Sequence, residues 1–273
     1  EIKVGLRVSF ALPEECLQEG YSVSRFGFCA ENGSFEKALQ ELAEIDKIKV
    51  HCLHCHFSTR ERKVETYQRI TERLCRLASE YVAETIEFID VGGGIYGELP
   101  ETFQQKAPTF DEYAEAIGGT VQRWFGSSPK KPVLVLEPGM AMVANAVDFV
   151  AKVITTKKNQ DDYFVVTDGS VHNLKPTMHK RNLPMAVFRK RCEGKRAVQY
   201  HIVGYTCMEK DYLAHNVTGV LPEKDDYILF GNAGAYSIVF NPPFIKERPA
   251  ILAADGGVFR LARKKEGFRQ FFS

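Results

Sequence analysis

The stretch IEFIDVGGG, residues 86–94, is an apolar run that ends in an aspartate and three glycines. Similar runs lie on either side of it, with IKVGLRVSF at 2–10 and KIKVHCLHCHF at 47–57 before it and PVLVLEPGMA at 132–141 after it. Short, nearly continuous apolar runs are typical of parallel strands that are buried on both faces. The first half of the chain is therefore predicted to be a β/α series.

Helical patterns separate these runs. Apolar side chains recur at helical spacing between residues 64 and 81, and Ser58 with Glu61 three positions later predicts a capping box that opens this helix. Ser58 and Thr59 would then begin a helix whose N–H groups and dipole suit a phosphate. Thr109 and Glu112 predict the start of a second helix before the fourth run.

After about residue 144 the sequence changes to β-branched and aromatic runs separated by turns. The runs are FVAKVITT, DYFVVTDG, AVQYHIVGY, DYILFGN and AYSIVF. They predict a mainly antiparallel C-terminal β domain over residues 145–273. Four β/α units are about half of an eight-unit barrel, whose usual size is about 250 residues. The start without Met favours a partial (β/α)8 barrel of the TIM type, and an open four-stranded sheet is the alternative.

Charge and composition narrow the classes of partner. The 273 residues carry 36 basic and 35 acidic side chains, a formal charge of +1, which gives no electrostatic footprint for nucleic acid or a membrane surface. No apolar run approaches the roughly 18 residues that span a bilayer. Seven scattered cysteines, an odd number, favour reduced thiols in the cytoplasm. A cytoplasmic protein is therefore expected, and small polar substrates remain open.

Two motifs stand at the ends of predicted strands. Three glycines after Asp90 let backbone amides approach a ligand closely, as phosphate loops require, although a tight turn explains them equally well. Glu137, followed by Pro138 and Gly139, places a carboxylate at the carboxyl edge of the sheet, where ligand sites of such folds lie. A carboxylate there can hold a proton on a heterocyclic nitrogen.

The run CLHCH combines thiols and imidazoles. On a strand, Cys52, His54 and His56 share one face, while Cys55 points to the other. A tetrahedral zinc site needs four converging ligands, and no second Cys or His pair of suitable spacing follows. We therefore predict no metal, and favour an imidazole that faces a cofactor over a buried histidine that is satisfied by the core.

The predicted β domain carries two further candidate groups. GYTCMEKD, residues 204–211, combines the thiol of Cys207 with two acids in a turn, and reactive groups concentrate on such loops. An inert, buried thiol is the alternative. Tyr236, in GAYS, offers a phenol that suits phosphate, and a core tyrosine is an equal alternative.

Taken together and in this order, VGLRVSF, SRFGF, HCHFST, DVGGG, EPG, GYTCMEKD and GAYS resemble the family of diaminopimelate, ornithine and arginine decarboxylases, which use pyridoxal 5'-phosphate (PLP). The resemblance implies that residues 1–144 are the C-terminal half of a PLP-binding β/α barrel and that residues 145–273 are the β domain. It also implies a homodimer whose active sites are built from both subunits.

The resemblance assigns roles residue by residue. His56 would stack on the pyridine ring, Glu137 would pair with the ring nitrogen, and Cys207 would act across the dimer interface as a proton donor or positioning group. The implied cofactor-binding residues are His56, Thr59, Gly92, Gly93, Gly94, Glu137, Gly139 and Tyr236. The implied substrate residues are Lys175, His179, Glu209 and Asp211.

The chain also departs from the family pattern. The family's Schiff-base lysine lies upstream of every motif present here, so it is expected on a segment absent from this chain, or the chain is an inactive homologue. Met140 replaces the arginine that follows EPG. Lys175 and His179 stand where diaminopimelate decarboxylases have an arginine and a tyrosine. We therefore predict decarboxylation of a polar or charged amino acid, with diaminopimelate decarboxylase itself as an alternative.

Overall fold

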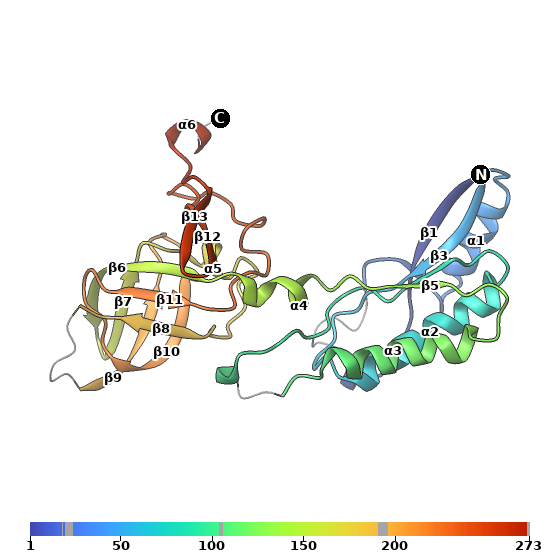
Figure 1. The fold of residues 1–273 in the computed structure, drawn as a ribbon, viewed down its shortest axis with the longest axis horizontal. Coiled ribbons are helices and arrows are strands. Elements are labelled where there is room, and N and C mark those ends of the chain that lie inside the picture. Colours follow the sequence, from blue (N-terminus) through green and yellow to red (C-terminus); the bar gives the residue numbers. More distant parts are fainter. Residues whose placement is uncertain (18, 20–23, 104–105, 191–195, 272–273) are drawn as a thin grey trace. The chain divides into compact units, whose positions relative to one another are not determined.

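The computed structural model describes residues 1–17, 19, 24–103, 106–190 and 196–271. The chain divides into two compact units, Glu1–Met142 and Val143–Ser273. Each unit contains its own sheet, and Figure 1 shows helices beside the first sheet and a strand-rich second unit.

A five-stranded parallel sheet forms the centre of the first unit. The strand order is β2-β1-β3-β4-β5, and every neighbouring pair is parallel. The strands are β1 (Ile2–Ser9), β2 (Phe28–Cys29), β3 (Ile48–His54), β4 (Phe88–Asp90) and β5 (Val133–Val135). Four of them coincide with the four apolar runs, so the predicted β/α series is confirmed. The short strand β2, within SRFGF, was not expected from the sequence.

Three long helices accompany this sheet, and α2 and α3 lie side by side (Figure 1). They are α1 (Ser34–Ala43), α2 (Val64–Tyr81) and α3 (Phe110–Phe125). The short helices are η1 (Glu14–Cys16), η2 (Glu101–Phe103), α4 (Gly139–Val143) and η3 (Ala144–Ala146). Among the described residues, no helix has the length and apolar character needed to cross a membrane.

The helices pack on one face of the sheet. Leu6, Val8 and Leu53 are buried in a single core with side chains of all three long helices. Arg7 and His54 alternate with these residues and are only partly buried, which places them on the opposite face. That second face therefore carries polar groups near the carboxyl ends of its strands.

The start of α3 agrees with the sequence prediction. The Thr109 side chain accepts a hydrogen bond from the Glu112 N–H, and the Glu112 carboxylate accepts one from the Thr109 N–H. Two N–H groups that the first turn would otherwise leave unpaired are thus satisfied. The predicted start of this helix is confirmed, and the structure shows that a capping box forms it.

The predicted start of α2 is wrong. The helix begins at Val64 with Lys63 as its N-cap, and no side chain caps it. The reason lies in the preceding segment, where Thr59 forms an isolated antiparallel bridge with Leu17 and the Arg60 N–H donates to the Cys16 carbonyl. Because these contacts hold the segment as a loop, Ser58 and Thr59 do not offer a helix N-terminus to a phosphate.

The second unit is built on a six-stranded sheet with the order β10-β9-β7-β6-β11-β8. Its strands are β6 (Phe149–Asn159), β7 (Asp162–Thr167), β8 (Met185–Phe188), β9 (Ala197–Val203), β10 (Tyr212–Val220) and β11 (Tyr227–Phe230). A separate hairpin joins β12 (Ile251–Asp255) to β13 (Val258–Arg263), and the short helices are α5 (Val171–Leu174) and α6 (Phe268–Phe271). All pairs are antiparallel except β7 with β9, so the prediction of a mainly antiparallel domain is confirmed.

One predicted strand is absent. The run AYSIVF, residues 235–240, forms a series of turns instead. Tyr236 has a φ of +65°, in the left-handed region that interrupts a strand, and the Ser237 hydroxyl donates to the Ala233 carbonyl. This local hydrogen bond curls the chain, and alternating apolar residues alone did not reveal it.

Candidate functional site

The carboxyl ends of three neighbouring strands bring the first group of candidate residues together. In the parallel register, His54 on β3 lies opposite Asp90 on β4, and Asp90 lies opposite Val135 on β5. The loops that follow these strands contain His56, the glycine turn and Glu137. The predicted position of the site at the carboxyl edge thus follows from the register of the sheet.

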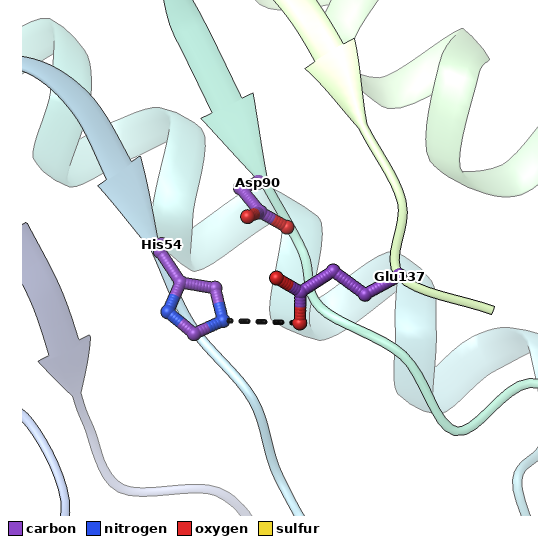
Figure 2. Close-up of side chains that lie close together, drawn as sticks. All are labelled: His54, Asp90 and Glu137. Atoms are coloured by element: carbon purple, nitrogen blue, oxygen red, sulfur yellow. Dashed lines mark ion pairs between the residues drawn. The ribbon is translucent and has the colours of Figure 1, made fainter. Parts of the chain in front are cut away.

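Three side chains converge at this edge, as Figure 2 shows: His54, Asp90 and Glu137. The donor atoms of all three lie within 4.8 Å of one another, and His54 Nε2 is 3.8 Å from Glu137 Oε2. His54 Nε2 is buried and has no hydrogen-bond partner among the described residues. Glu137, by contrast, is 55% exposed and can reach a bound molecule.

The two carboxylates make this position favourable for a positive charge or a proton. Burial raises the pKa of Asp90, and the nearby Glu137 adds to the rise, although the Gly92 N–H that donates to Asp90 Oδ1 at 2.9 Å opposes it. Two carboxylates and one imidazole are also donor types that metal ions accept. The prediction of no metal therefore stays a prediction.

The glycine turn is a cradle with no room for side chains. A Cβ on Gly93 would lie 2.1 Å from the Glu137 carbonyl oxygen, and one on Gly92 would lie 2.6 Å from the Cys55 carbonyl oxygen. Gly92 and Gly94 also have φ values of +70° and +98°, which favour glycine. The turn therefore packs directly against the loops that follow β3 and β5.

Hydrogen bonds already occupy part of this turn. The Gly92 N–H donates to Asp90, the Gly93 N–H donates to His56 Nδ1 at 3.2 Å, and the Glu137 N–H donates to the Gly92 carbonyl at 2.9 Å. Of the three glycines, Gly94 is the one whose N–H has no partner among the described residues. An anion at this turn would thus meet Gly94, with Gly92 and Gly93 shaping the turn.

The surroundings of His56 favour its neutral form. Burial lowers its pKa and the nearby Arg7 and His54 lower it further, although the carboxylates of Glu137 and Asp90 act in the opposite direction. Because Nδ1 accepts from the Gly93 N–H, the neutral ring carries its proton on Nε2. Arg7 also donates to the His56 carbonyl at 3.3 Å, which holds the backbone at this residue.

We expect His56 to titrate with a midpoint below about 6.5, the ordinary value for histidine. Since the folded pKa is lowered, the unfolded chain binds the proton first, and the free energy of unfolding should fall as the pH drops below about 6.5. NMR titration of the imidazole tests the midpoint, and denaturation at several pH values tests the stability. His56→Gln should flatten this pH dependence; an unchanged slope would contradict the assignment.

Thr59 and Tyr67 stand beside the glycine turn. Thr59 is buried and hydrogen-bonds to the Tyr67 hydroxyl, which itself donates to the Gly93 carbonyl at 3.3 Å. Burial raises the pKa of Tyr67 to about 12, so the phenol keeps its proton. Gly139 is different, since its N–H donates to the Glu137 carbonyl and a Cβ there would meet no atom within 4 Å.

Sequence reasoning missed three residues of this edge as site residues: His54, Asp90 and Tyr67. His54 and Asp90 are each the last residue of a parallel strand, so the strand ends alone could have paired them. Tyr67 was assigned only to the apolar side of a helix, and nothing in the sequence signalled that its hydroxyl meets Gly93.

The turn from Gly204 to Asp211 in the second unit is held by Asp211. Its buried carboxylate accepts hydrogen bonds from the Ser170 hydroxyl, the Val171 N–H, and the N–H and hydroxyl of Thr206. Four donors occupy both oxygens, so the carboxylate holds the turn in place, while the predicted substrate role of Asp211 stays a prediction. Cys207 and Glu209 lie on the same turn and are exposed.

The remaining candidates of the second unit differ in exposure. Lys175 is 1% exposed, and burial lowers its pKa to about 8. His179 is exposed overall. Its imidazole is nevertheless partly shielded from solvent, and this shielding together with the charge of Lys175 lowers its pKa. Tyr236 is 57% exposed, and its φ of +65° costs conformational energy. An exposed tyrosine held in this conformation is unlike the core tyrosine that was the alternative.

Comparison with known families gives a match over the first unit. Residues 1–144 match the family described as pyridoxal-dependent decarboxylase, pyridoxal binding domain. Among curated proteins, the diaminopimelate decarboxylase of Haemophilus influenzae is 26% identical over 234 residues, which cover 84% of this chain and 54% of that protein. The chain thus spans a little over half the length of the curated relatives it matches.

Solved structures show the same fold. Diaminopimelate decarboxylase from Helicobacter pylori, complexed with L-lysine, has a TM-score of 0.79 at 19% identity over 99% of this chain and 66% of that one. The arginine decarboxylase of Paramecium bursaria Chlorella virus has a TM-score of 0.73 at 20% identity over 89% of this chain and 63% of that one. The predicted fold class, a partial barrel followed by a β domain, is confirmed.

Proposed function

The chain belongs to the pyridoxal-dependent decarboxylase family, and we propose that the carboxyl edge of its parallel sheet binds PLP in an amino-acid decarboxylase. The observation that carries this proposal is the cluster of His54, Asp90 and Glu137 beside a glycine turn. The two carboxylates of this cluster would pair with a protonated ring nitrogen, and the glycine turn leaves no room for the Cβ of any other residue.

The residues at this edge fit the parts of the cofactor. Glu137 would pair with the pyridine nitrogen, His56 would stack on the ring, and Gly94 with the hydroxyl of Thr59 would meet the phosphate. Bound PLP would supply the electron sink that takes up the electron pair left on the α-carbon of an amino acid when CO2 departs. The neutral state of His56 suits stacking, because it places no second positive charge beside the ring.

The second unit supplies further proposed residues. Cys207 is an exposed thiol that would hold or deliver a proton near the α-carbon, and Tyr236 would reach the phosphate. Lys175, His179 and Glu209 would contact the distal group of the substrate. The hydrogen bonds of Asp211 support this role for the turn, because they fix the loop that carries Cys207 and Glu209. We also propose that two copies combine in a homodimer to complete each site.

The domain boundary and the location are part of the same proposal. We assign residues 1–144 to the PLP-binding barrel half and residues 145–273 to the β domain, and the two compact units divide at nearly this point.

A cytoplasmic location is also proposed. The six cysteines that the structure describes are free, which suits a reducing cytoplasm. Cys192 lies outside the described residues.

The substrate is proposed to be an amino acid with a polar or charged distal group. The relatives include diaminopimelate and arginine decarboxylases, whose substrates carry such groups. The exposed Glu209 offers a negative charge for a distal amine or guanidinium, while Lys175 and His179 suit a carboxylate. A diaminopimelate decarboxylase or a close variant fits both the acidic Glu209 and the basic pair of Lys175 and His179, because its substrate carries a distal amine and a distal carboxylate.

Release of CO2 from candidate amino acids tests the function. The intact gene product, loaded with PLP, should decarboxylate at least one of diaminopimelate, lysine, ornithine and arginine, and it should leave apolar amino acids unchanged. Binding of PLP without any CO2 release would instead support an inactive homologue. Formation of the opposite enantiomer without CO2 would indicate a racemase.

Borohydride reduction tests the proposed position of the Schiff-base lysine. Peptide mapping after reduction should find PLP attached to a lysine outside the 273 residues, because no segment here resembles the family's lysine segment. Attachment to one of the lysines in this sequence would contradict this part of the proposal.

A further inference from the structure

Arg62 is a half-buried cation in the loop between β3 and α2. It follows Thr59 by three residues and has a φ of +51°, which is uncommon for a residue with a side chain. It adjoins three segments of the proposed PLP site.

The contacts of Arg62 place it at the carboxyl edge of the sheet. Its Nη1 lies 3.8 Å from the sulfur of Met140, and its guanidinium carbon lies 5.0 Å from the centre of the Tyr96 ring. Its carbonyl accepts a hydrogen bond from the Tyr113 hydroxyl. Met140 follows Gly139, and Tyr96 follows Gly94 by two residues, so the guanidinium lies between the loops after β4 and β5.

The charge of Arg62 also acts on Tyr67, which contacts the glycine turn. Its positive charge lowers the pKa of Tyr67, against the larger effect of burial. The Tyr67 hydroxyl donates to the Gly93 carbonyl, and it lies 2.9 Å from where a Cβ on Gly94 would be. The positive charge of Arg62 is therefore felt by a residue that lies directly against the turn at which a phosphate is proposed to bind.

Among the residues that the structure describes, no carboxylate lies within 4.0 Å of the Arg62 guanidinium. Three other arginines on this unit have such a partner, since Arg69 pairs with Glu15, Arg73 with Glu31 and Arg123 with Glu72. A planar guanidinium without an anionic partner, held on an aromatic ring, is suited to bind a phosphate through two parallel hydrogen bonds.

We propose that Arg62 binds the phosphate of PLP and supplies the positive charge that Met140 does not provide. The inference rests on the proposed function. The sequence has methionine where the family pattern has an arginine after EPG, and the structure places another guanidinium against that methionine. Arg62, which comes from the loop after β3, would thus replace the arginine that the family pattern has after EPG, and the same edge of the sheet would keep a positive charge.

Equilibrium binding of PLP and of pyridoxal, which lacks the phosphate, tests this role in the intact gene product. Arg62→Gln should weaken PLP binding about 10-fold to 100-fold, the usual effect of losing a hydrogen bond to a charged group, and should change pyridoxal binding little. Inorganic phosphate should compete with PLP less well in the variant. Circular dichroism should confirm that the variant is folded.

Two further variants sharpen the result. Arg60→Gln removes an exposed guanidinium two residues away and should leave PLP affinity unchanged. The double variant Arg62→Met with Met140→Arg exchanges the two contacting side chains and should recover most of the lost affinity. Equal weakening of PLP and pyridoxal, or a PLP affinity unchanged by Arg62→Gln, would overturn the role of Arg62. Failure of the unaltered protein to bind PLP would overturn the proposed function itself.

Discussion

Glu137→Gln should lower kcat for decarboxylation by roughly 10²–10³, the range seen when one preorganised electrostatic contact is removed. Glutamine keeps the size of the side chain but cannot pair as an anion with a protonated ring nitrogen. The negative position at the carboxyl edge would then rest on Asp90, whose pKa is raised by burial. Initial rates on the best substrate, with PLP content measured in parallel, give this result.

Stability should change little in this variant. The Glu137 side chain is 55% exposed, and its hydrogen bond to the glycine turn comes from the backbone N–H, which the substitution keeps. Glu80→Gln, on an exposed position of α2, is the matched control and should retain full activity. If kcat of Glu137→Gln equals that of the control, Glu137 does not act on the cofactor.

Gly93→Ala should destabilise the protein by about 3 kcal/mol and abolish PLP binding at cofactor concentrations that saturate the unaltered chain. The added Cβ would lie 2.1 Å from the Glu137 carbonyl oxygen, so the loops after β4 and β5 must separate. Separation would also break the hydrogen bond from the Glu137 N–H to the Gly92 carbonyl. Chemical denaturation and PLP titration measure the two effects.

Gly118→Ala provides a control of opposite sign. Gly118 lies in α3, where a Cβ would meet no atom within 4 Å, and alanine should stabilise the helix by up to about 1 kcal/mol. PLP binding should be unaffected by this change. A Gly93→Ala variant that is as stable as the unaltered protein would contradict the close packing of the glycine turn against Glu137.

Four of the five strands of the first unit could be predicted because each is a short apolar run with its own turn; the two-residue strand β2 is too short to give such a pattern. The register that pairs His54 with Asp90 could not be read directly, because it depends on how β3 and β4 align in space. The sequence placed His54 and His56 on one strand face, and the resemblance singled out His56. The structure adds His54, whose buried Nε2 faces Glu137.

Errors in the sequence prediction arose where side chains bond locally or across the chain. Ser58 has the spacing of a capping box, but the bridge between Thr59 and Leu17 holds that segment in a loop. Residues 235–240 have β-branched and aromatic character, but the left-handed Tyr236 turns the chain. For Asp211 the substrate role implied by the resemblance stays a prediction, and the structure adds four hydrogen-bond donors on its carboxylate that the sequence did not reveal.

Hydrogen–deuterium exchange of the intact gene product, with and without PLP, tests the central claim most directly. Saturating PLP should slow exchange in the three loops that follow β3, β4 and β5, at residues 55–62, 91–96 and 136–140, since these segments would enclose the cofactor. Absence of saturable PLP binding, or protection confined to segments away from these loops, would contradict the assignment of the carboxyl edge as the PLP site.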